Sequence, residues 1–435
     1  MLVIGLDMGT TTLSAVVLET DGGQVLESLT VPNNTDIKAL PWERLQNPDA
    51  IWNKASGMLD RLTRDHPGIA CIGLTGQMHG LLYADAAGNA VSPLYTWQDK
   101  RGEQLMPSGN TYVQTLSETT ASHLATGYGA ATHFYNVENG CVPANAESAM
   151  TIHDYIGMKL TRSARPLTHV SDTASFGAPN WPELQLLVHT TDKTMCMGQT
   201  VQGIPVSIAI GDNQASFIGS VKNARESVLV NVGTGGQISV AVDGPIVCEG
   251  AETRPYVDGG SLLVGFSLCG GYAYSLLERL FREIASLGGA NIDSMYELMN
   301  ALADAPVTNP LQISTLFRGT RQNPSLRGSI TQISDENLTA AHLVQGVLSG
   351  MAAELHEPYA QMIRYMNSVP TQLVGAGNAI RQNAALRRIF EETFGMQIVL
   401  PMHCEEAAYG AALFSLAAAG FCPTVADAQQ IIRFK

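Results

Sequence analysis

Asp7 stands where an apolar strand, expected over Leu2–Leu6, gives way to a turn of Gly9 and three threonines. The free amides and hydroxyls of such a turn can donate to phosphate oxygens. The carboxylate can hold Mg²⁺ through water, because Mg²⁺ takes few protein ligands and keeps several waters. The competing interpretation is an ordinary hairpin turn that Asp7 caps. A copy of the turn at Gly233–Gly235 favours phosphate binding.

Asp212 is a second carboxylate in a similar setting. It follows the buried-type strand Val206–Ile210 through Gly211 and precedes a helix expected from Ala215. An Asp at this place is commonly a helix N-cap. It could equally be a general base that removes a proton from an attacking hydroxyl. The residues alone leave both interpretations open.

Two short segments mix aromatic, amide and charged side chains in the way that polyol ligands require. One contains Trp97, Asp99 and Arg101, and the other contains Gln77 and His79 around a methionine. Hydroxyl groups need donors and acceptors, while an aromatic face covers the C–H side of a sugar. The same residues are also common as core anchors and hydrogen-bonded structural side chains.

The chain repeats one design after 224 positions, which indicates an internal duplication. A strand and a Gly/Thr turn recur, so that Asp7, Gly9 and Thr10 correspond to Asn231, Gly233 and Thr234. Each half also has an apolar strand that runs into a glycine-rich turn, at Ile72–Thr75 and at Gln372–Val374. The simplest architecture is two α/β lobes with a cleft between them and a boundary near Ser216–Glu226. We expect the lobes to span residues 1–219 and 220–435.

Composition narrows the class of protein. The 435 residues are 45% hydrophobic and only 15% charged, which is typical of a globular chain with a sizeable core. The net charge is −14, and no basic run exceeds the pair Arg387 and Arg388, so nucleic acid is not expected as a partner. The apolar stretch Gly410–Cys422 is too short to span a bilayer as a helix, so no membrane partner is expected.

The seven cysteines are scattered and form no C-x-x-C pair, which argues against a disulfide framework or a zinc knuckle. The chain meets Asp7 before an apolar stretch of signal-peptide length develops. These features predict a cytoplasmic protein.

Three familiar site patterns are absent. Gly375 and Gly377 are followed by Ile380 where a dinucleotide fingerprint requires Gly or Ala. No Gly-x-x-x-x-Gly-Lys-Thr loop exists, which excludes a P-loop kinase. His403 and the acidic pair Glu405–Glu406 lack the spacing of a metal-binding helix and are expected to begin a C-terminal helix.

The motifs, taken in order, resemble those of the FGGY carbohydrate kinases over nearly the whole chain. The segments that carry the resemblance are Gly5–Thr11, Thr75–Gly80, Trp97–Arg101, Gly211–Gln214, Asn231–Gly235 and Gly375–Asn378. Within the family, Ala125–Thr132 and Thr151–Tyr155, together with the triplet at Arg165, resemble the branch that phosphorylates the seven-carbon ketose sedoheptulose at its terminal hydroxyl.

The resemblance implies a pair of ribonuclease-H-like lobes of the actin and Hsp70 type that close over ATP, Mg²⁺ and a sugar. It implies that Asp212 is the general base and that Asp7 organises Mg²⁺. The implied sugar pocket consists of Gln77, Met78, His79, Trp97, Asp99, Tyr128 and Asn213. The implied ATP-binding residues are Thr10, Thr11, Thr12, Gly233, Thr234, Gly235, Gly271, Gly375, Gly377 and Asn378.

One departure from the family bears on catalysis. Relatives usually carry Lys or Arg where this chain has Ser14, and many carry Lys where it has His133. A cation at the first position would balance charge on the transferring phosphoryl group. Turnover is therefore expected to be weak, to depend more on Mg²⁺, or to use a cation from elsewhere in the fold.

The leading hypothesis is a ketose kinase that acts on sedoheptulose, with a xylulokinase-like pentulose kinase as the alternative. A sugar or nucleotide sensor that lost efficient transfer is a second class, which Ser14 would allow. An actin-like or chaperone-like ATPase is a third, and the polar segment Trp97–Arg101 and Asp212 argue against it. A homodimer is the default expectation for such an enzyme.

Overall fold

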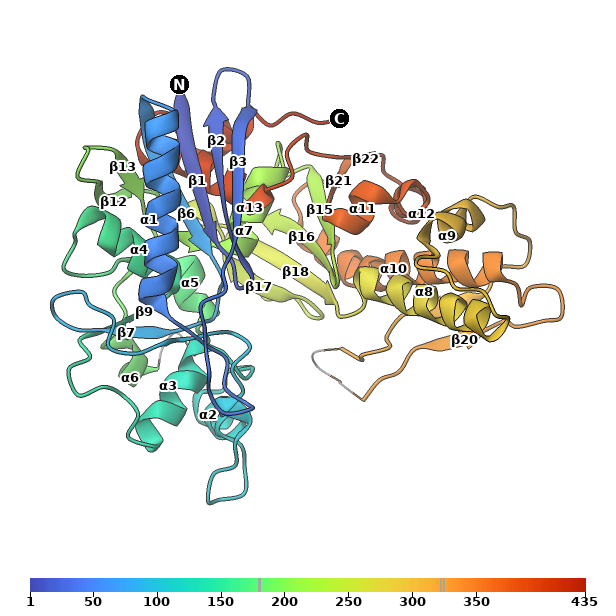
Figure 1. Cartoon of the computed structure of the whole chain (residues 1–435), viewed down its shortest axis with the longest axis horizontal. Coiled ribbons are helices and arrows are strands. Elements are labelled where there is room, and N and C mark those ends of the chain that lie inside the picture. The colour runs from blue at the N-terminus through green and yellow to red at the C-terminus, as the bar shows by residue number, and fades with distance from the viewer. Residues whose placement is uncertain (179–180, 321–322, 324) are drawn as a thin grey trace. The chain divides into compact units, whose positions relative to one another are not determined.

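The computed structural model describes residues 1–178, 181–320, 323 and 325–435, which fold into two compact α/β units (Figure 1). Unit 1 comprises Met1–Lys222, Arg254–Gly260 and Glu405–Ile432. Unit 2 comprises Asn223–Thr253, Ser261–Cys404 and Arg433–Lys435. The predicted division at 219/220 lies close to the first change of unit. It does not include the two later segments that pack with unit 1.

Unit 1 is built on a seven-stranded sheet with the order β12-β13-β6-β1-β2-β3, in which β14 also pairs with β6. Its strands are β1 (Leu2–Met8), β2 (Thr12–Glu19), β3 (Gln24–Pro32), β6 (Ile69–Gly76), β12 (Cys196–Gln199), β13 (Pro205–Ser207) and β14 (Ile210–Gly211). Its helices are α1 (Pro48–Asp65), α2 (Tyr112–Thr120), α3 (Gly129–Glu138), α4 (Ile152–Thr161), α5 (Val170–Ser175), α6 (Pro182–Gln185), α7 (Asp212–Ser220), α13 (Glu406–Ala418) and α14 (Val425–Gln429).

Short strands and 3-10 turns complete unit 1. They are β4 (Asp36–Ile37), β5 (Leu45–Gln46) and β8 (Leu94–Tyr95), which form one small sheet; β7 (Leu82–Ala84) with β9 (Ser148–Met150); β10 (Thr168–His169) with β11 (Thr190–Thr191); and the turns η1 (Arg101–Glu103) and η2 (Val257–Gly259).

Unit 2 is built on a six-stranded sheet with the order β17-β18-β16-β15-β21-β22. Its sheet contains β15 (Ser227–Val232), β16 (Gly236–Val242), β17 (Glu252–Pro255), β18 (Ser261–Ser267), β21 (Gln372–Ala376) and β22 (Ile398–Val399), and β19 (Gln312–Ser314) and β20 (Ser329–Thr331) form a separate pair. The last two residues of β17, from Arg254 on, are counted with unit 1. Its helices are α8 (Gly270–Leu287), α9 (Tyr296–Ala303), α10 (Ala340–Met362), α11 (Asn378–Gln382) and α12 (Ala384–Phe394), with the turn η3 (Ile363–Tyr365).

The predicted duplication is confirmed. The strands β6-β1-β2-β3 of unit 1 and β21-β15-β16-β18 of unit 2 have the same neighbour order. In both units the hairpin is antiparallel, and its first strand pairs in parallel with a later one. Parallel strands place their carboxyl ends at one edge of the sheet, so each hairpin turn lies beside the turn that follows the later strand.

Alternation along β1 explains how unit 1 packs. Ile4 and Leu6 belong to a buried apolar cluster shared with α1 and α4. Gly5 lies on the other face, where a Cβ would overlap the backbone of Ala408 in α13. Because side chains alternate between faces, Asp7 lies on the Gly5 face of the sheet. Helix α13 packs on β1, β6 and α7, so it also positions the helix that begins at Asp212.

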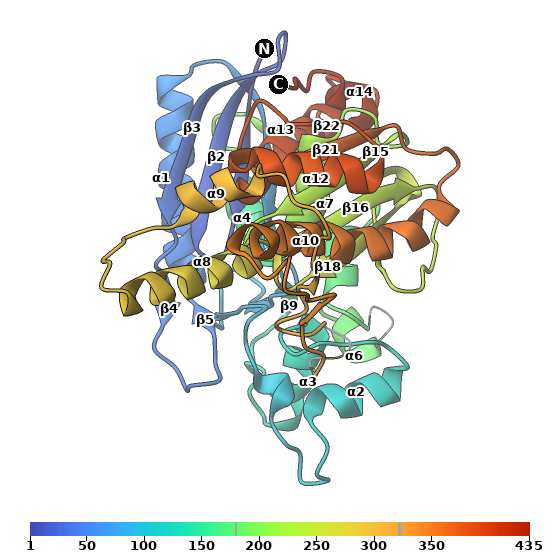
Figure 2. The ribbon, with the colours of Figure 1, turned by 90° about the vertical axis from the view of Figure 1, so that its right-hand side faces the viewer.

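Two local expectations need correction. Helix α7 begins at Asp212 rather than at Ala215, and the strand expected over Val206–Ile210 is divided into β13 and β14. The C-terminal helix is confirmed, since α13 begins at Glu406. Figure 2 shows the same elements from the side. No helix within the described parts of the chain has the length and apolar character needed to cross a bilayer.

Candidate active site

Asp7 lies one residue before the end of β1, where it pairs with Ser14 of β2 and Thr75 of β6. Its Oδ1 atom is buried and accepts no hydrogen bond from the described residues. Burial, followed by the charge of Asp212, raises the pKa of Asp7 to about 7. A buried carboxylate oxygen without a donor is costly unless a cation or its water completes it. The residues at this turn therefore fit the predicted Mg²⁺.

Asp212 is the first residue of α7, and the glycine before it holds the N-cap position. No side chain caps this helix, so the N-cap interpretation is wrong. Strands β14 and β1 both pair in parallel with β6, which brings Asp212 and Asp7 to the same edge of the sheet. Burial raises the pKa of Asp212 to about 6, although Arg254 and His153 oppose the rise.

A cation that the sequence analysis missed acts on Asp212. Arg254 belongs to unit 1, where its Nη1 lies 3.7 Å from the sulfur of Met78. It is the strongest of the charges that lower the pKa of Asp212. Ser14, in contrast, is buried and hydrogen-bonds to Thr30 at 3.0 Å. No motif marks Arg254, and the missing cation at Ser14 was the only signal that one was needed.

Thr10 joins the glycine turn to the predicted sugar pocket. The indole Nε1 of Trp97 donates to Thr10 Oγ1 at 2.9 Å, and Thr10 donates to Gln77 Oε1 at 3.0 Å. Gln77 is buried, and its Nε2 donates to Gln46 at 3.0 Å. Trp97 is 45% exposed, so its ring can cover a ligand. Gln77, whose amide is engaged at both ends, holds this arrangement in place.

His79 and Tyr128 form a stacked pair, with ring centroids 4.3 Å apart and planes 1° from parallel. His79 has a positive φ of 72°. Its backbone N donates to Ser175 Oγ at 3.1 Å, and its Nδ1 donates to the Ser175 carbonyl oxygen at 2.6 Å. Helix α5, which ends at Ser175, therefore holds a strained residue of the predicted pocket.

Asp99 is fully buried, and its oxygens are already engaged. Oδ1 accepts from the backbone N and Nε of Arg101 at 3.0 and 2.7 Å, and Oδ2 accepts from the backbone N of Arg44 at 2.9 Å. The Arg101 guanidinium lies 4.0 Å from the Tyr95 ring centroid. The role of Asp99 in sugar binding stays a prediction, and this geometry favours a supporting role through the loop that carries Trp97.

Asn213 follows Asp212 in α7 and is 8% exposed. Its Oδ1 atom is buried and has no donor among the residues that the structure describes. An amide oxygen in this position would be completed by a ligand hydroxyl. Met78 is also buried, and a Cβ on Gly211 would lie 2.7 Å from its sulfur, so Met78 packs directly against the start of α7.

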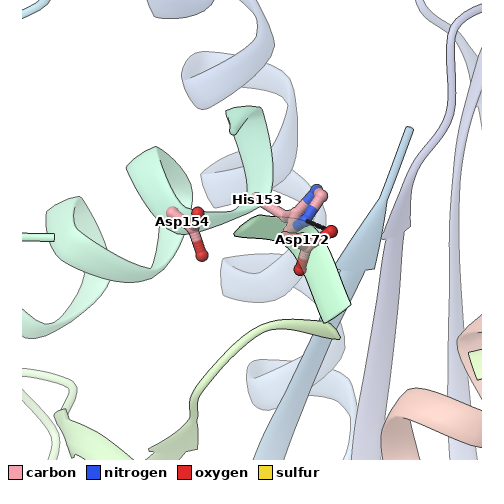
Figure 3. Close-up of side chains that lie close together, drawn as sticks. All are labelled: His153, Asp154 and Asp172. Carbon is pink, nitrogen blue, oxygen red and sulfur yellow. Dashed lines mark ion pairs between the residues drawn. The ribbon is translucent and has the colours of Figure 1, made fainter. Parts of the chain in front are cut away.

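Unit 1 also contains a buried cluster of titratable side chains that sequence reasoning did not single out. His153 at the start of α4 and Asp172 of α5 form an ion pair at 3.1 Å, and Asp154 lies nearby (Figure 3). All three are fully buried. Burial by itself disfavours the charged imidazole, but the carboxylates of Asp172, Asp154 and Asp212 outweigh it and raise the pKa of His153 to about 9.

In unit 2, the predicted ATP-binding residues gather at the carboxyl ends of β15 and β21. Gly271 N donates to Gly233 O at 2.8 Å, which fastens the turn to the first residues of α8. Gly377 has a φ of +81°, and a Cβ there would lie 2.5 Å from Asn231 Oδ1. Only glycine fits this approach. The side chain of Thr234 and that of Asn378, which begins α11, are exposed.

The structure thus brings the predicted residues together in two groups. Unit 1 holds Asp7, Thr10, Thr11, Thr12, Gln77, Met78, His79, Trp97, Asp99, Tyr128, Asp212 and Asn213; unit 2 holds Gly233, Thr234, Gly235, Gly271, Gly375, Gly377 and Asn378. The first group carries the carboxylates and polyol-type side chains, and the second carries glycine turns with the exposed side chains of Thr234 and Asn378.

Two family models match the chain. Residues 2–192 match the N-terminal domain of the FGGY family of carbohydrate kinases, and residues 238–419 match its C-terminal domain. The chain belongs to the FGGY family of carbohydrate kinases. It is therefore a phosphotransferase that acts on sugars.

Individual relatives cover nearly the whole chain. Sedoheptulokinase from Mus musculus is 27% identical over 95% of this chain and 97% of its own length. Xylulose kinase from Staphylococcus xylosus is 25% identical over 95% of this chain and 90% of its own. The crystal structure of xylulose kinase from Rhodospirillum rubrum superposes with a TM-score of 0.85 at 19% identity, covering 100% of this chain and 93% of the other. The predicted two-lobed, ribonuclease-H-like α/β fold is confirmed.

Proposed function

We propose that this sugar kinase transfers the γ-phosphoryl group of ATP to the terminal hydroxyl of a ketose, and that the ketose is sedoheptulose. The observation that carries the proposal is the setting of Asp212. This carboxylate begins a helix that it does not cap, has a raised pKa, and lies beside residues of polyol-binding type. The similarity to mouse sedoheptulokinase supports the seven-carbon sugar.

Asp212 would act as the general base. It accepts the proton of the terminal hydroxyl as that oxygen attacks the γ-phosphorus, while the bond from phosphorus to the bridging oxygen breaks and ADP leaves. Transfer of this kind has a loose transition state, so positioning and charge stabilisation supply most of the catalysis. A positioned base contributes about 10²- to 10⁴-fold.

The sugar would lie against the exposed ring of Trp97, with its hydroxyls near the Asn213 amide and the stacked pair of His79 and Tyr128. The hydrogen bond from Trp97 to Thr10 orients the indole ring. Arg254 would supply the positive charge that the chain lacks at Ser14, and by lowering the pKa of Asp212 it keeps the base ionised at neutral pH.

ATP would bind through the glycine turns of unit 2, with the exposed Thr234 side chain near the phosphates and with Gly375, Gly377 and Asn378 beside the adenosine. Asp7 would hold Mg²⁺ through water, because its buried Oδ1 lacks a protein donor. When bound, Mg²⁺ neutralises charge on the phosphates. The amides after Gly9 would suit phosphate oxygens, while the Thr10 hydroxyl stays engaged with Gln77.

The direct test is ATP-dependent phosphorylation of a sugar panel with Mg²⁺. Sedoheptulose, xylulose, ribulose and glycerol are compared with a no-sugar control, and the Asp212→Asn variant serves as the blank. We expect the highest kcat/KM on sedoheptulose and a loss of at least about 10²-fold in the variant. A folded Asp212→Asn protein with unchanged turnover would contradict the assignment of the base.

Xylulose is the second candidate substrate, which the similarity to Staphylococcus xylosus xylulose kinase favours. One carbon more or less changes binding by only about 1 to 3 kcal/mol, so the panel must be compared by kcat/KM. Tight sugar binding without turnover on any member would instead indicate a sensor. A homodimer and a cytoplasmic location remain predictions.

A further inference from the structure

His153 and Asp172 form a buried ion pair next to the strand ends that carry the candidate active site. His153 Nε2 lies 3.1 Å from Asp172 Oδ1, and neither side chain is exposed (Figure 3). His153 comes from the start of α4, and Asp172 comes from the short helix α5. Burying an ion pair costs desolvation free energy, and this cost is offset only when nearby charges or hydrogen bonds also stabilise the two groups.

The imidazole of His153 lies against the strand ends that carry the site. A Cβ on Gly76, the last residue of β6, would lie 2.8 Å from His153 Nδ1 and 2.9 Å from the carbonyl oxygen of Met8. Gly76 therefore leaves room for the ring next to the end of β1. Asp7 directly precedes Met8, so the ring abuts the strand end that presents this carboxylate.

Helix α5 connects the pair to other parts of the site. Ser171, next to Asp172, accepts a hydrogen bond from the backbone N of Gly211 at 3.4 Å. Gly211 directly precedes Asp212. Ser175, at the end of the same helix, holds both nitrogens of His79 described above. One short helix thus contacts the ion pair, the residue before the predicted base and a residue of the predicted sugar pocket.

The charged groups around His153 are predominantly carboxylates. Asp172 and Asp154 come from α5 and α4, and Asp212 comes from α7; all three raise the pKa of His153, against the effect of burial. His153 in turn lowers the pKa of Asp7 and of Asp212. Two cations therefore act on Asp212: His153, and Arg254, whose Nη1 lies 3.7 Å from the sulfur of Met78.

We propose that His153, held by Asp172, is a positioning residue for phosphoryl transfer. Its imidazole lies against Gly76, which pairs with Gly211, and it is the buried counter-ion of Asp212, while α5 holds the start of α7 through Ser171. This inference rests on the proposed role of Asp212 as the base. His153 does not contact the sugar or the phosphate. It acts through Asp212, and it complements Arg254 in a chain that has no cation at position 14.

Three variants test the kinetic consequence. His153→Gln removes the charge but keeps a hydrogen-bonding side chain, His153→Lys restores a cation, and His133→Gln is the matched control. His133 is also a buried histidine, bonded to Tyr83 at 2.7 Å, but burial lowers its pKa to about 4, so it is neutral at pH 7. The measurements are kcat and KM for sugar and for ATP between pH 5.5 and 8.5.

We expect His153→Gln to lower kcat by about twofold at pH 7 and by nearly tenfold at pH 5.5, to leave both KM values within about twofold, and to move the acid limb of kcat/KM to higher pH. His153→Lys should recover most of the loss at neutral pH, and His133→Gln should keep the wild-type profile. Equal kcat losses in His153→Gln and His153→Lys, or an unshifted acid limb, would overturn the proposal.

A second measurement does not depend on activity, so failure of the proposed function would not hide the result. The melting temperatures of wild type, His153→Gln, Asp212→Asn and the double variant form a double-mutant cycle. If His153 stabilises the Asp212 charge, Asp212→Asn will raise the melting temperature more in the His153→Gln background than in wild type. Equal shifts in the two backgrounds would overturn the proposal.

The same samples decide the competing interpretation of the group as a metal site. His153, Asp154 and Asp172 each offer one ligand atom, and these atoms lie within 4.8 Å of one another. Elemental analysis of the purified protein should find no tightly held metal that His153→Gln removes. If the wild-type protein holds one equivalent of metal and His153→Gln does not, His153 is a metal ligand rather than a counter-ion. That result would overturn the proposal.

Discussion

Replacing Arg254 by glutamine should move the pH dependence of turnover to higher pH. The base must be ionised to accept a proton, and the pKa of Asp212 in the folded chain is about 6. Ionisation alone then makes kcat/KM of the wild type about tenfold lower at pH 5 than at pH 7. Arg254 is the strongest charge that holds this pKa down, so its removal raises the pKa further.

The size of the effect follows from the ionised fraction. A neighbouring opposite charge lowers the pKa of a carboxyl by about one unit or more. If Arg254→Gln raises the pKa of Asp212 by one unit, ionisation alone costs about tenfold at pH 5 but less than about twofold at pH 7. The loss therefore grows as the pH falls, which separates it from a loss of sugar binding that would be similar at every pH.

The assay is kcat/KM for the sugar from pH 5 to 8.5 at saturating ATP and Mg²⁺. Saturating Mg²⁺ keeps Asp7, whose pKa lies near 7, in its ionised form. Arg225→Gln is the control, because this arginine is 76% exposed and pairs with Asp243 in unit 2. An acid limb that stays at the wild-type pH in Arg254→Gln would refute the reasoning.

Three further outcomes are expected. Asp212→Asn should raise the free energy of unfolding at pH 8 by about 3 kcal/mol and leave it nearly unchanged below pH 4. Burial lifts the pKa of Asp212 from 3.8 to about 6, so ionisation of the folded chain is costly above that range. Urea unfolding at both pH values checks this. Asp7→Asn should raise the Mg²⁺ concentration for half-maximal activity at least about tenfold, and an unchanged Mg²⁺ titration would remove Asp7 from the metal site. Gly377→Ala should destabilise the chain by about 1 to 3 kcal/mol and raise KM for ATP more than KM for sugar, since a Cβ meets Asn231 at a positive φ; wild-type stability would contradict the close approach.

Much of the fold could be predicted from local patterns. An apolar strand followed by a Gly/Thr turn depends on residues that are close in sequence, so the hairpins at Asp7 and at Asn231 were recognisable from the residues alone. Their repetition indicated two similar lobes, and the structure has the same strand order in both. The family followed from these motifs, because their order along the chain is specific.

The environment of Asp99 could not be predicted from the residues next to it in sequence. The sequence placed Trp97 and Asp99 in the predicted sugar pocket, with Arg101 close by in the same segment. In the structure, Arg101 folds back onto Asp99 and both are buried, so only Trp97 remains exposed. Spacing cannot distinguish a carboxylate that faces a ligand from one that pairs with an arginine two residues away, because burial depends on what the rest of the chain places over the loop.

By itself, the sequence determined the two carboxylates, the glycine turns and the duplicated α/β architecture, since each depends on neighbouring residues. Only the tertiary structure decided which charges surround Asp212. Arg254 packs with unit 1 from far along the chain, and His153 and Asp172 meet from separate helices. Electrostatic interactions depend on distance in space and on burial, and neither quantity is encoded in the spacing of residues along the chain.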